Sequence, residues 1–231
     1  MSSGNPAPLA SSTNSARTRD RLKAAAQILF ARHGVDGVTV QQIVTAAGQR
    51  NNASLHYHFG SKEELIRQLI VEGAKELDER RKALLDSHER SGAPFTARDL
   101  LRIMVLPVFD LTQEERWQGY VQFTSSLQTS NREMFRSALN NRWNSAYVRC
   151  FDHLKKLLQH IPAPVLEQRL SLFIIYGNAI TSVRDFELTT RRQQQNRFWN
   201  KPFTIENILD TLEASVTCPP SAATLDQLKQ A

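Results

Sequence analysis

Two short helical patterns on either side of Gly48 constrain this chain more than any other feature. Apolar residues recur at intervals of three and four over 40–47, which predicts a short amphipathic helix. Thr39 and Gln42 stand three residues apart at its start, where each side chain can satisfy a free backbone donor. Gly48 allows a tight reversal of the backbone, and a second short polar segment follows at 52–57. Helix, glycine turn and short polar helix together predict a helix-turn-helix.

The second helix of such a motif presents its N-terminal residues to base edges in the major groove of DNA. Arg50 can form a bidentate pair with guanine, and Asn51 or Asn52 can do so with adenine. Lys62 stands at the start of the next helix, where a cation beside free backbone N–H groups can bind a phosphate without reading sequence. The alternative is that these residues form only a polar turn, with Asn52 as an N-cap.

The flanking motifs resemble the TetR family of bacterial transcriptional regulators. The matching motifs are FARHG at 30–34, TVQQIVTAAG at 39–48 and LHYHFGSKEEL at 55–65, within a match that covers 17–70. Relatives in this family bind DNA as dimers and use a helical body to bind an inducer. The resemblance therefore implies a DNA-binding head followed by a ligand-binding and dimerisation body.

By this resemblance, His56, Tyr57, His58 and Lys62 occupy positions that family members use to hold backbone phosphates. The chain departs from the family pattern in two places. His56 replaces the usual aromatic residue, and one more residue than is common lies between the turn glycine and Tyr57. The extra residue leaves the base-reading register open. The predicted DNA-contacting residues are Thr39, Gln49, Arg50, Asn51, Asn52, Ser54, His56, Tyr57, His58 and Lys62.

The positive charge of the chain is concentrated in its first quarter. Residues 1–62 carry +5 of the formal net charge of +6, as expected of a basic nucleic-acid-binding module on a near-neutral body. Cys150 and Cys218 are far apart, which argues against a disulfide framework or a zinc site, so we expect no metal and no cofactor. The sequence has no apolar run long enough for a membrane span and no signal-peptide core at its start, so we expect a cytoplasmic protein without membrane association.

Helix-start signals and apolar periodicity predict an all-α chain with four parts. Residues 1–16, rich in Ser, Asn, Ala and Pro, are expected to form a disordered arm. Residues 17–70 form the helix-turn-helix domain, in which a linker helix starts at 61. Residues 71–216 form the helical body, and residues 217–231 form a loose tail.

Capping patterns and proline positions locate the helices of the body. The expected helices are 96–111, 113–127, 131–160, 164–190 and 203–216. Pro107 should kink or break the first of them. The charged run KELDERRK at 75–82 is interpreted as a solvated face held by ion pairs between residues four apart.

Large aromatic side chains are frequent in these body helices. They suit either ordinary core packing or a pocket for an apolar small molecule, and the family resemblance favours the pocket. The predicted pocket residues are Phe109, Trp117, Tyr120, Phe123, Trp143, Tyr147, Phe173 and Tyr176. The resemblance also implies a dimer interface on the last two body helices, for which we predict Leu170, Ile174, Gly177, Ile180, Ile208 and Leu212.

Together with these patterns, the family resemblance implies a dimeric repressor that an apolar small molecule releases from a near-palindromic operator in double-stranded DNA. A transcriptional activator is an alternative, as is a DNA-binding module that senses no ligand and acts through a protein partner. An enzyme using His56 and His58 with Glu63 or Glu64 is disfavoured, because two residues two apart on a helix face in different directions. No catalytic residue is therefore expected.

Overall fold

The computed structural model describes residues 9–189, 198–199 and 201–230, and all regular structure in these ranges is helical, as predicted. The elements are α1 (Leu9–His33), α2 (Val40–Ala46), α3 (Ala53–Phe59), α4 (Lys62–Ser91), α5 (Ala97–Leu111), the 3-10 turn η1 (Glu115–Trp117), α6 (Tyr120–Ser130), α7 (Arg132–Leu139), α8 (Ser145–Leu157), α9 (Ala163–Thr189), α10 (Thr204–Thr217) and α11 (Ala222–Leu228).

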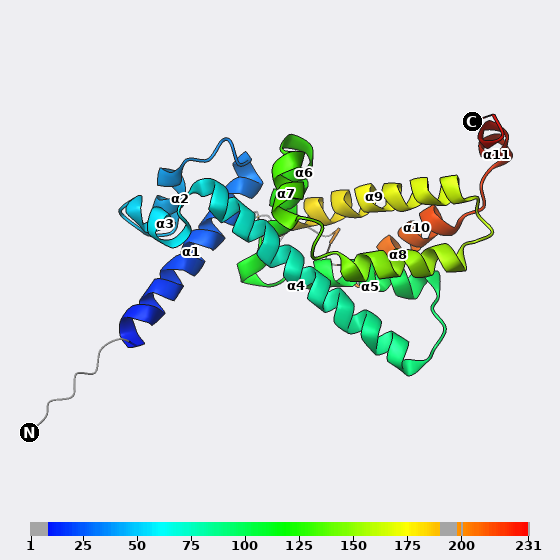
Figure 1. The fold of residues 1–231 in the computed structure, drawn as a ribbon, viewed down its shortest axis with the longest axis horizontal. Helices are drawn as coiled ribbons and strands as arrows, with labels where there is room; N and C mark the ends of the chain where they lie inside the picture. The colour runs from blue at the N-terminus through cyan, green and yellow to red at the C-terminus, as the bar shows by residue number, and fades with distance from the viewer. Residues whose placement is uncertain (1–8, 190–197, 200, 231) are drawn as a thin grey trace, which may run out of the picture.

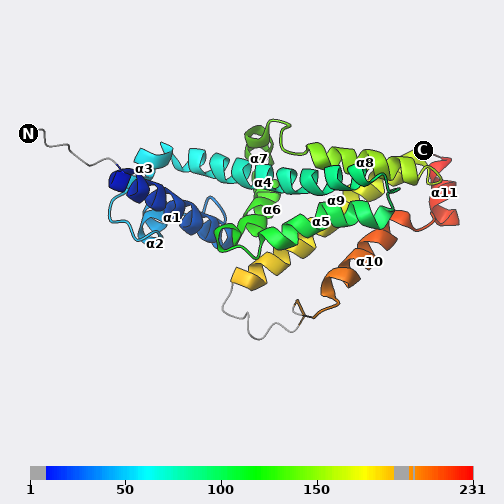
Figure 2. The same cartoon turned by 90° about the horizontal axis from the view of Figure 1, so that it is seen from below.

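The molecule is elongated, with a small head of α1, α2 and α3 at one end (Figure 1). Helix α4 has 30 residues and runs from the head along the length of the body, as both views show (Figures 1 and 2). One apolar core joins the head to the first half of α4 and to α6. A second core joins α5, α8, α9 and α10 around Leu85, near the other end of α4. Helix α4 therefore belongs to both cores and connects them.

Local capping explains where several helices begin. Thr39 and Gln42 form the predicted capping box at α2. The hydroxyl of Ser61 accepts a hydrogen bond from the backbone N–H of Glu64 and starts α4. Pro107 was expected to kink or break its helix, but α5 runs without a break from 97 to 111.

Two predicted helices are each divided in the structure. The segment expected at 131–160 forms α7 and α8, separated by a loop in which Asn140, Asn141 and Trp143 have positive φ angles. Asp78 of α4 accepts hydrogen bonds from the hydroxyl of Ser145 and from the next backbone N–H, and so caps α8. This capping group is distant in sequence, and the continuous apolar stripe conceals the break.

The second divided segment, expected at 113–127, contains η1 and the start of α6. Gly119 precedes α6 with φ +81°, and the carboxylate of Asp185 accepts hydrogen bonds from the backbone N–H groups of Gly119 and Gln122. A buried acid of α9 therefore caps α6.

The two ends of the chain are more helical than expected. Helix α1 begins at Leu9 rather than at 17, so residues 9–16 of the expected disordered arm are helical, while residues 1–8 lie outside the described residues. The expected loose tail contains α11, which Ser221 caps, and its last residue also lies outside the described part.

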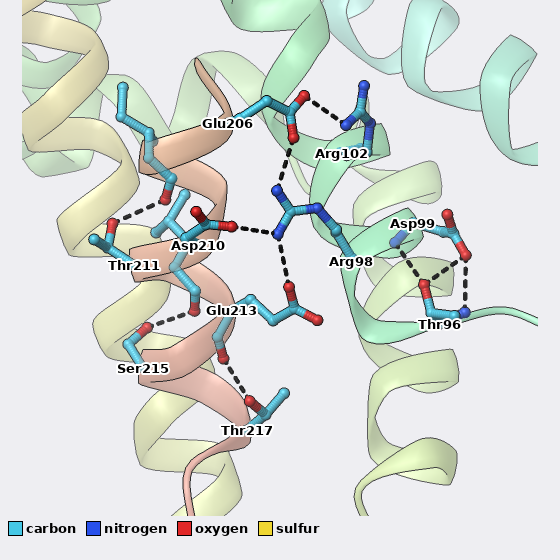
Figure 3. Close-up of polar contacts among 12 residues, drawn as sticks. Thr96, Arg98, Asp99, Arg102, Glu206, Asp210, Thr211, Glu213, Ser215 and Thr217 are labelled. Atoms are coloured by element: carbon cyan, nitrogen blue, oxygen red, sulfur yellow. Dashed lines mark hydrogen bonds and ion pairs between the residues drawn. The ribbon is translucent and has the colours of Figure 1, made fainter. Parts of the chain in front are cut away.

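Helix α10 is held against α5 by a cluster of charged side chains (Figure 3). Arg98 of α5 donates hydrogen bonds to three carboxylates on successive turns of α10, namely those of Glu206, Asp210 and Glu213. Arg102 donates a further bond to Glu206.

Within the described ranges, no helix is both long enough and apolar enough to cross a bilayer.

Candidate functional site

The helix-turn-helix is fixed by a small set of buried side chains. Ile43 and Val44 of α2 and Leu55 and Phe59 of α3 all point into the core of the head. Gly48 makes the turn between the helices with φ +70°, a conformation in which a side chain would be strained. Because these apolar faces point inward, the remaining face of α3 lies at the outer end of the head (Figure 1).

Most of the predicted DNA-contacting residues lie on this outer surface. Tyr57 is 80% exposed, an unusual placement for a large aromatic side chain. Thr39, Arg50, Asn51 and His56 are also exposed. The remaining members of the set are half-buried, namely Gln49, Asn52, Ser54, His58 and Lys62. The proposed base readers therefore lie just before and at the start of α3, and the proposed phosphate-binding residues lie along α3 and at the start of α4.

The two asparagines differ in what they can offer to a base. The Oδ1 atom of Asn51 accepts a hydrogen bond of 2.9 Å from the backbone N–H of Ala53, so it caps α3. A bidentate pair with adenine needs both the oxygen and the amide nitrogen, and this contact uses one of the two lone pairs of the oxygen. The Oδ1 atom of Asn52 is buried and has no hydrogen-bond partner among the described residues. Arg50 is exposed and has no competing contact of this kind.

His56 and Lys62 both have structural contacts beside their predicted role. The Nδ1 atom of His56 lies 2.8 Å from the carbonyl oxygen of Gly60. A carbonyl only accepts hydrogen bonds, so Nδ1 carries a proton and Nε2 is left for contacts outside the protein. The Nζ atom of Lys62 donates to the carbonyls of Val35 and Val38, both at 3.0 Å. Lys62 therefore holds the loop between α1 and α2 and keeps one N–H for another acceptor.

An exposed polar helix in a helix-turn-helix, within the most basic part of the chain, defines a DNA-binding protein. Residues 22–69 match the model of a family described as bacterial regulatory proteins, tetR family. The chain therefore carries the DNA-binding domain of the TetR family of transcriptional regulators. No curated protein sequence matches the chain.

Several solved structures share the fold of most of the chain. AmtR from Mycobacterium smegmatis is 19% identical with a TM-score of 0.59, over 91% of this chain and 94% of that one. A putative tetR family transcription regulator from Shewanella sp. PV-4 is 16% identical with a TM-score of 0.55, over 86% and 97%. A putative TetR-family regulator from Mesorhizobium loti is 20% identical with a TM-score of 0.50, over 87% and 94%. The likeness extends the shared fold from the head to the body.

The body contains a cavity of about 280 Å³ among α4, α6, α8 and α9. Three of the predicted pocket residues line it, namely Tyr120, Trp143 and Tyr147. The other five do not line this cavity. Phe109, Trp117, Phe123 and Phe173 are buried in the two apolar cores, and Tyr176 is 40% exposed on the outside of α9.

The cavity also has polar walls that the aromatic pattern does not predict. Its polar residues are Arg81, Thr124, Ser125, Gln128, Asn178 and Thr181. Arg81 lies in the charged run at 75–82, which was interpreted as a solvated face. The ion pairs Lys75–Glu79 and Glu76–Arg80 do form on the surface, but Arg81 faces inward. Its spacing of four from Leu77 and Leu85, both buried, is the signal that could have identified it.

Most of the predicted dimer residues lie on faces of their helices that the same chain covers. Leu170, Ile208 and Leu212 are buried in the core of this chain, and Ile174 lines the cavity. Ile180 packs against the core, while Gly177 is half-buried. The large apolar side chains of α9 that are exposed are Leu172, Ile175, Tyr176, Val183 and Phe186.

The cavity adjoins the head through direct contacts. The hydroxyl of Tyr120 donates a hydrogen bond of 3.1 Å to the carbonyl of Ile70 in α4. Gln27 of α1 is buried and donates to the carbonyls of Arg116 and Gln118, which flank the end of η1. Helices α1 and α4, which both contact the recognition helix α3, are therefore tied to the segment that leads into α6.

Proposed function

We propose that this protein is a dimeric, cytoplasmic transcriptional repressor that a small-molecule ligand releases from a near-palindromic operator. The observation that carries the proposal is the continuity of α4, which begins beside the recognition helix and lines the cavity at Ala74, Leu77 and Arg81. A change in the shape of the cavity can therefore act on the helix that carries the head. Repression, ligand release and dimerisation are typical of the family.

The exposed face of α9 supports the proposed dimer. Leu172, Ile175, Val183 and Phe186 recur at helical spacing on one side of α9, and Ile175 is 65% exposed. The cavity-lining residues Ile174 and Thr181 lie roughly on the opposite side. Exposed apolar side chains on one side of a helix, here Leu172, Ile175 and Val183 among the described residues, are typical of an interface between protein molecules. A two-fold dimer brings the same stripe of both copies together.

A dimer of this kind would place two copies of α3 on one face of a DNA duplex. Helix-turn-helix dimers read two half-sites one helical turn apart, at a spacing of about 34–36 Å. Ligand binding would favour a distance between the two copies of α3 that does not match the distance between the half-sites. Such coupling between a ligand site and a DNA site is typically about 1–3 kcal/mol. The contacts of Tyr120 with α4 and of Gln27 with η1 support this route, because they join the cavity to the head.

The proposal is tested by selecting operators from random DNA with the purified full chain, followed by titration of the selected duplex. We expect a near-palindromic consensus with half-sites one turn apart and a complex of two chains per duplex. A single asymmetric half-site bound by one chain would contradict the dimeric arrangement. Replacement of Ile175 and Val183 by Glu should leave the head folded and abolish binding of two chains, whereas replacement of the exposed Glu79 by Lys is the surface control.

A further inference from the structure

We propose that the cavity of the body binds a small anionic ligand, whose carboxylate is held by the guanidinium of Arg81, rather than a wholly apolar molecule. The inference rests on the proposed function insofar as it names the class of ligand for the sensing site. Three observations support it: the contacts of Arg81, the unused hydrogen-bond donors of Arg81 and Trp143, and the size of the cavity.

Arg81 presents an unpaired guanidinium end to the cavity. Its Nε atom donates to the carbonyl of Met104 at 3.0 Å, which fixes the orientation of the side chain. The guanidinium carbon lies 4.9 Å from the centre of the Tyr147 ring, so one face is stacked on an aromatic wall. Within the described residues, neither Nη atom has a hydrogen-bond partner. The two terminal nitrogens therefore offer the fork that suits a carboxylate.

The carboxylate of Asp78 interacts favourably with this charge, but it forms no ion pair with Arg81. Asp78 lies one turn earlier on α4, but its two carboxylate oxygens accept hydrogen bonds from the hydroxyl of Ser145 and the backbone N–H of Ala146. No ion pair involves Arg81 in the described part of the chain. Burial lowers the pKa of the Arg81 guanidinium, which nevertheless stays protonated near neutral pH. A buried cation that no ion pair holds is costly, and such groups occur at binding sites more often than in ordinary cores.

Other polar groups of the cavity also favour a ligand that accepts hydrogen bonds. The indole Nε1 of Trp143 is buried and has no partner within the described residues. Burial raises the pKa of Tyr147, so its hydroxyl stays neutral beside the guanidinium. The oxygen of Gln128 already accepts a hydrogen bond from the amide of Asn178 at 3.3 Å. The cavity thus has unused donors at Arg81 and Trp143.

The cavity limits the size of the ligand. Its volume of about 280 Å³ corresponds to about nine non-hydrogen atoms, counting about 30 Å³ for each group of the size of a water molecule. Aromatic and aliphatic side chains line the rest of the wall, including Leu77, Phe135 and Ile174. A compact aromatic carboxylate such as benzoate, or a medium-chain fatty acid such as octanoate, has the matching combination of one anionic end and an apolar body.

Thermal unfolding of the full chain tests the inference. Sodium benzoate and sodium octanoate are compared with benzamide and octanamide at equal ionic strength, with sodium chloride as the reference. We expect the carboxylates at saturation to raise the melting temperature by about 2–4 °C or more, and the neutral amides to have much smaller effects. Arg81→Met should abolish the shift. Lys82→Met, which removes the same charge from the adjacent exposed position, should retain it.

Three outcomes would overturn the inference: equal shifts for acids and amides, an undiminished shift in Arg81→Met, or no shift by either carboxylate in the unmodified chain. Arg81→Met also removes the bond to Met104, so its fold is checked by circular dichroism. If it does not fold, Trp143→Phe is the second variant, and the inference then requires at least several-fold weaker carboxylate binding. Operator binding is measured separately. Carboxylate binding without DNA binding would refute the regulator, whereas DNA binding without carboxylate binding would refute only this inference.

Discussion

The hydroxyl of Tyr120 lies 3.1 Å from the carbonyl oxygen of Ile70, and this hydrogen bond joins the wall of the cavity to the head end of α4. Both groups are buried, and burial raises the pKa of Tyr120 far above its usual value, so the hydroxyl stays protonated as a donor. The same contact fixes the start of α6 relative to the helix that follows the recognition helix.

Removing this hydroxyl should weaken the contact of Tyr120 with α4, which joins the cavity to the head. Tyr120→Phe leaves the carbonyl of Ile70 without its buried side-chain donor, which should lower the free energy of unfolding by about 1 kcal/mol. Urea denaturation measures the difference. Tyr57→Phe is the matched control, because Tyr57 is exposed and should change stability by less than about 0.5 kcal/mol. Equal stabilities of the two variants would show that the Tyr120 bond does not hold the joint.

A methyl group at Gly73 of α4 should disrupt the same contact between Tyr120 and α4. A Cβ atom there would lie 2.2 Å from a ring carbon of Tyr120, so Gly73→Ala should be destabilising by about 1–3 kcal/mol despite the better helix propensity of alanine. Gly177→Ala in α9 meets no atom within 4 Å and should instead stabilise the isolated chain, by about 0.5–1 kcal/mol. Thermal melts of both variants at low protein concentration compare the two effects. A neutral or stabilising Gly73→Ala would show that Tyr120 is free to move.

Lys62→Ala should affect both stability and DNA binding. The variant loses two hydrogen bonds to the loop carbonyls of Val35 and Val38, so its stability should fall by about 1.5–3 kcal/mol. Binding to all DNA sequences should weaken, and the slope of log K against log salt should fall by roughly one if the third N–H binds a phosphate. A salt titration on operator and on random DNA measures the slope. An unchanged slope would restrict Lys62 to its structural role.

Arg50 and Asn51 should contribute differently to base recognition. Arg50→Ala should cost about 1–3 kcal/mol of operator binding and relax the preference at one base pair. Asn51→Asp retains the oxygen that caps α3, so it should preserve helix stability while changing DNA binding. Selection from random DNA with each variant shows the effect on the consensus. An identical consensus for Arg50→Ala and the unmodified chain would remove Arg50 as a base reader.

The contact between α5 and α10 should weaken in acid. Hydrogen bonds from Arg98 and Arg102 lower the pKa of Glu206 below its usual 4.5. A carboxyl whose pKa is lower in the folded state stabilises the fold above its unfolded pKa and loses this contribution as the pH falls through the folded value. We expect the urea midpoint to fall between about pH 5 and pH 3, and to fall less in Arg98→Gln. Lys229→Gln, at the exposed pair with Asp226, is the control, and parallel pH profiles of all three proteins would contradict the prediction.

The parts of the fold that sequence alone predicts are those with local causes. The capping box of Thr39 and Gln42 and the charge pairs along α4 involve residues three or four apart, and they form as predicted. The divisions before α6 and α8 depend on Asp185 and Asp78, which reach these helix ends from other helices. Such contacts leave no signal in the local sequence, so the sequence predicts one continuous helix in each of these two segments.

The difference between local patterns and tertiary contacts also explains which site residues could be predicted from sequence. The head matches a known family pattern over residues 22–69, so the helices that form its exposed surface could be predicted. The body lacks such a pattern, and apolar periodicity does not show which side of α9 is covered by the same chain. Ile174 and Ile175 are adjacent and equally apolar, but one lines the cavity and the other is exposed. The inward position of Arg81 could not be read from the charged run at 75–82, because it depends on tertiary packing.

Sequence-selective retardation of DNA by the purified chain tests the central claim most directly, namely that α3 enters the major groove. At moderate ionic strength we expect a duplex selected from random DNA to be retarded at concentrations at least about a thousandfold below those needed for unrelated DNA. Removing contacts at the preceding turn and on α3 through the combined Arg50→Ala and Tyr57→Ala substitutions should reduce this preference. Equal retardation of selected and unrelated duplexes by the unmodified chain would contradict the account.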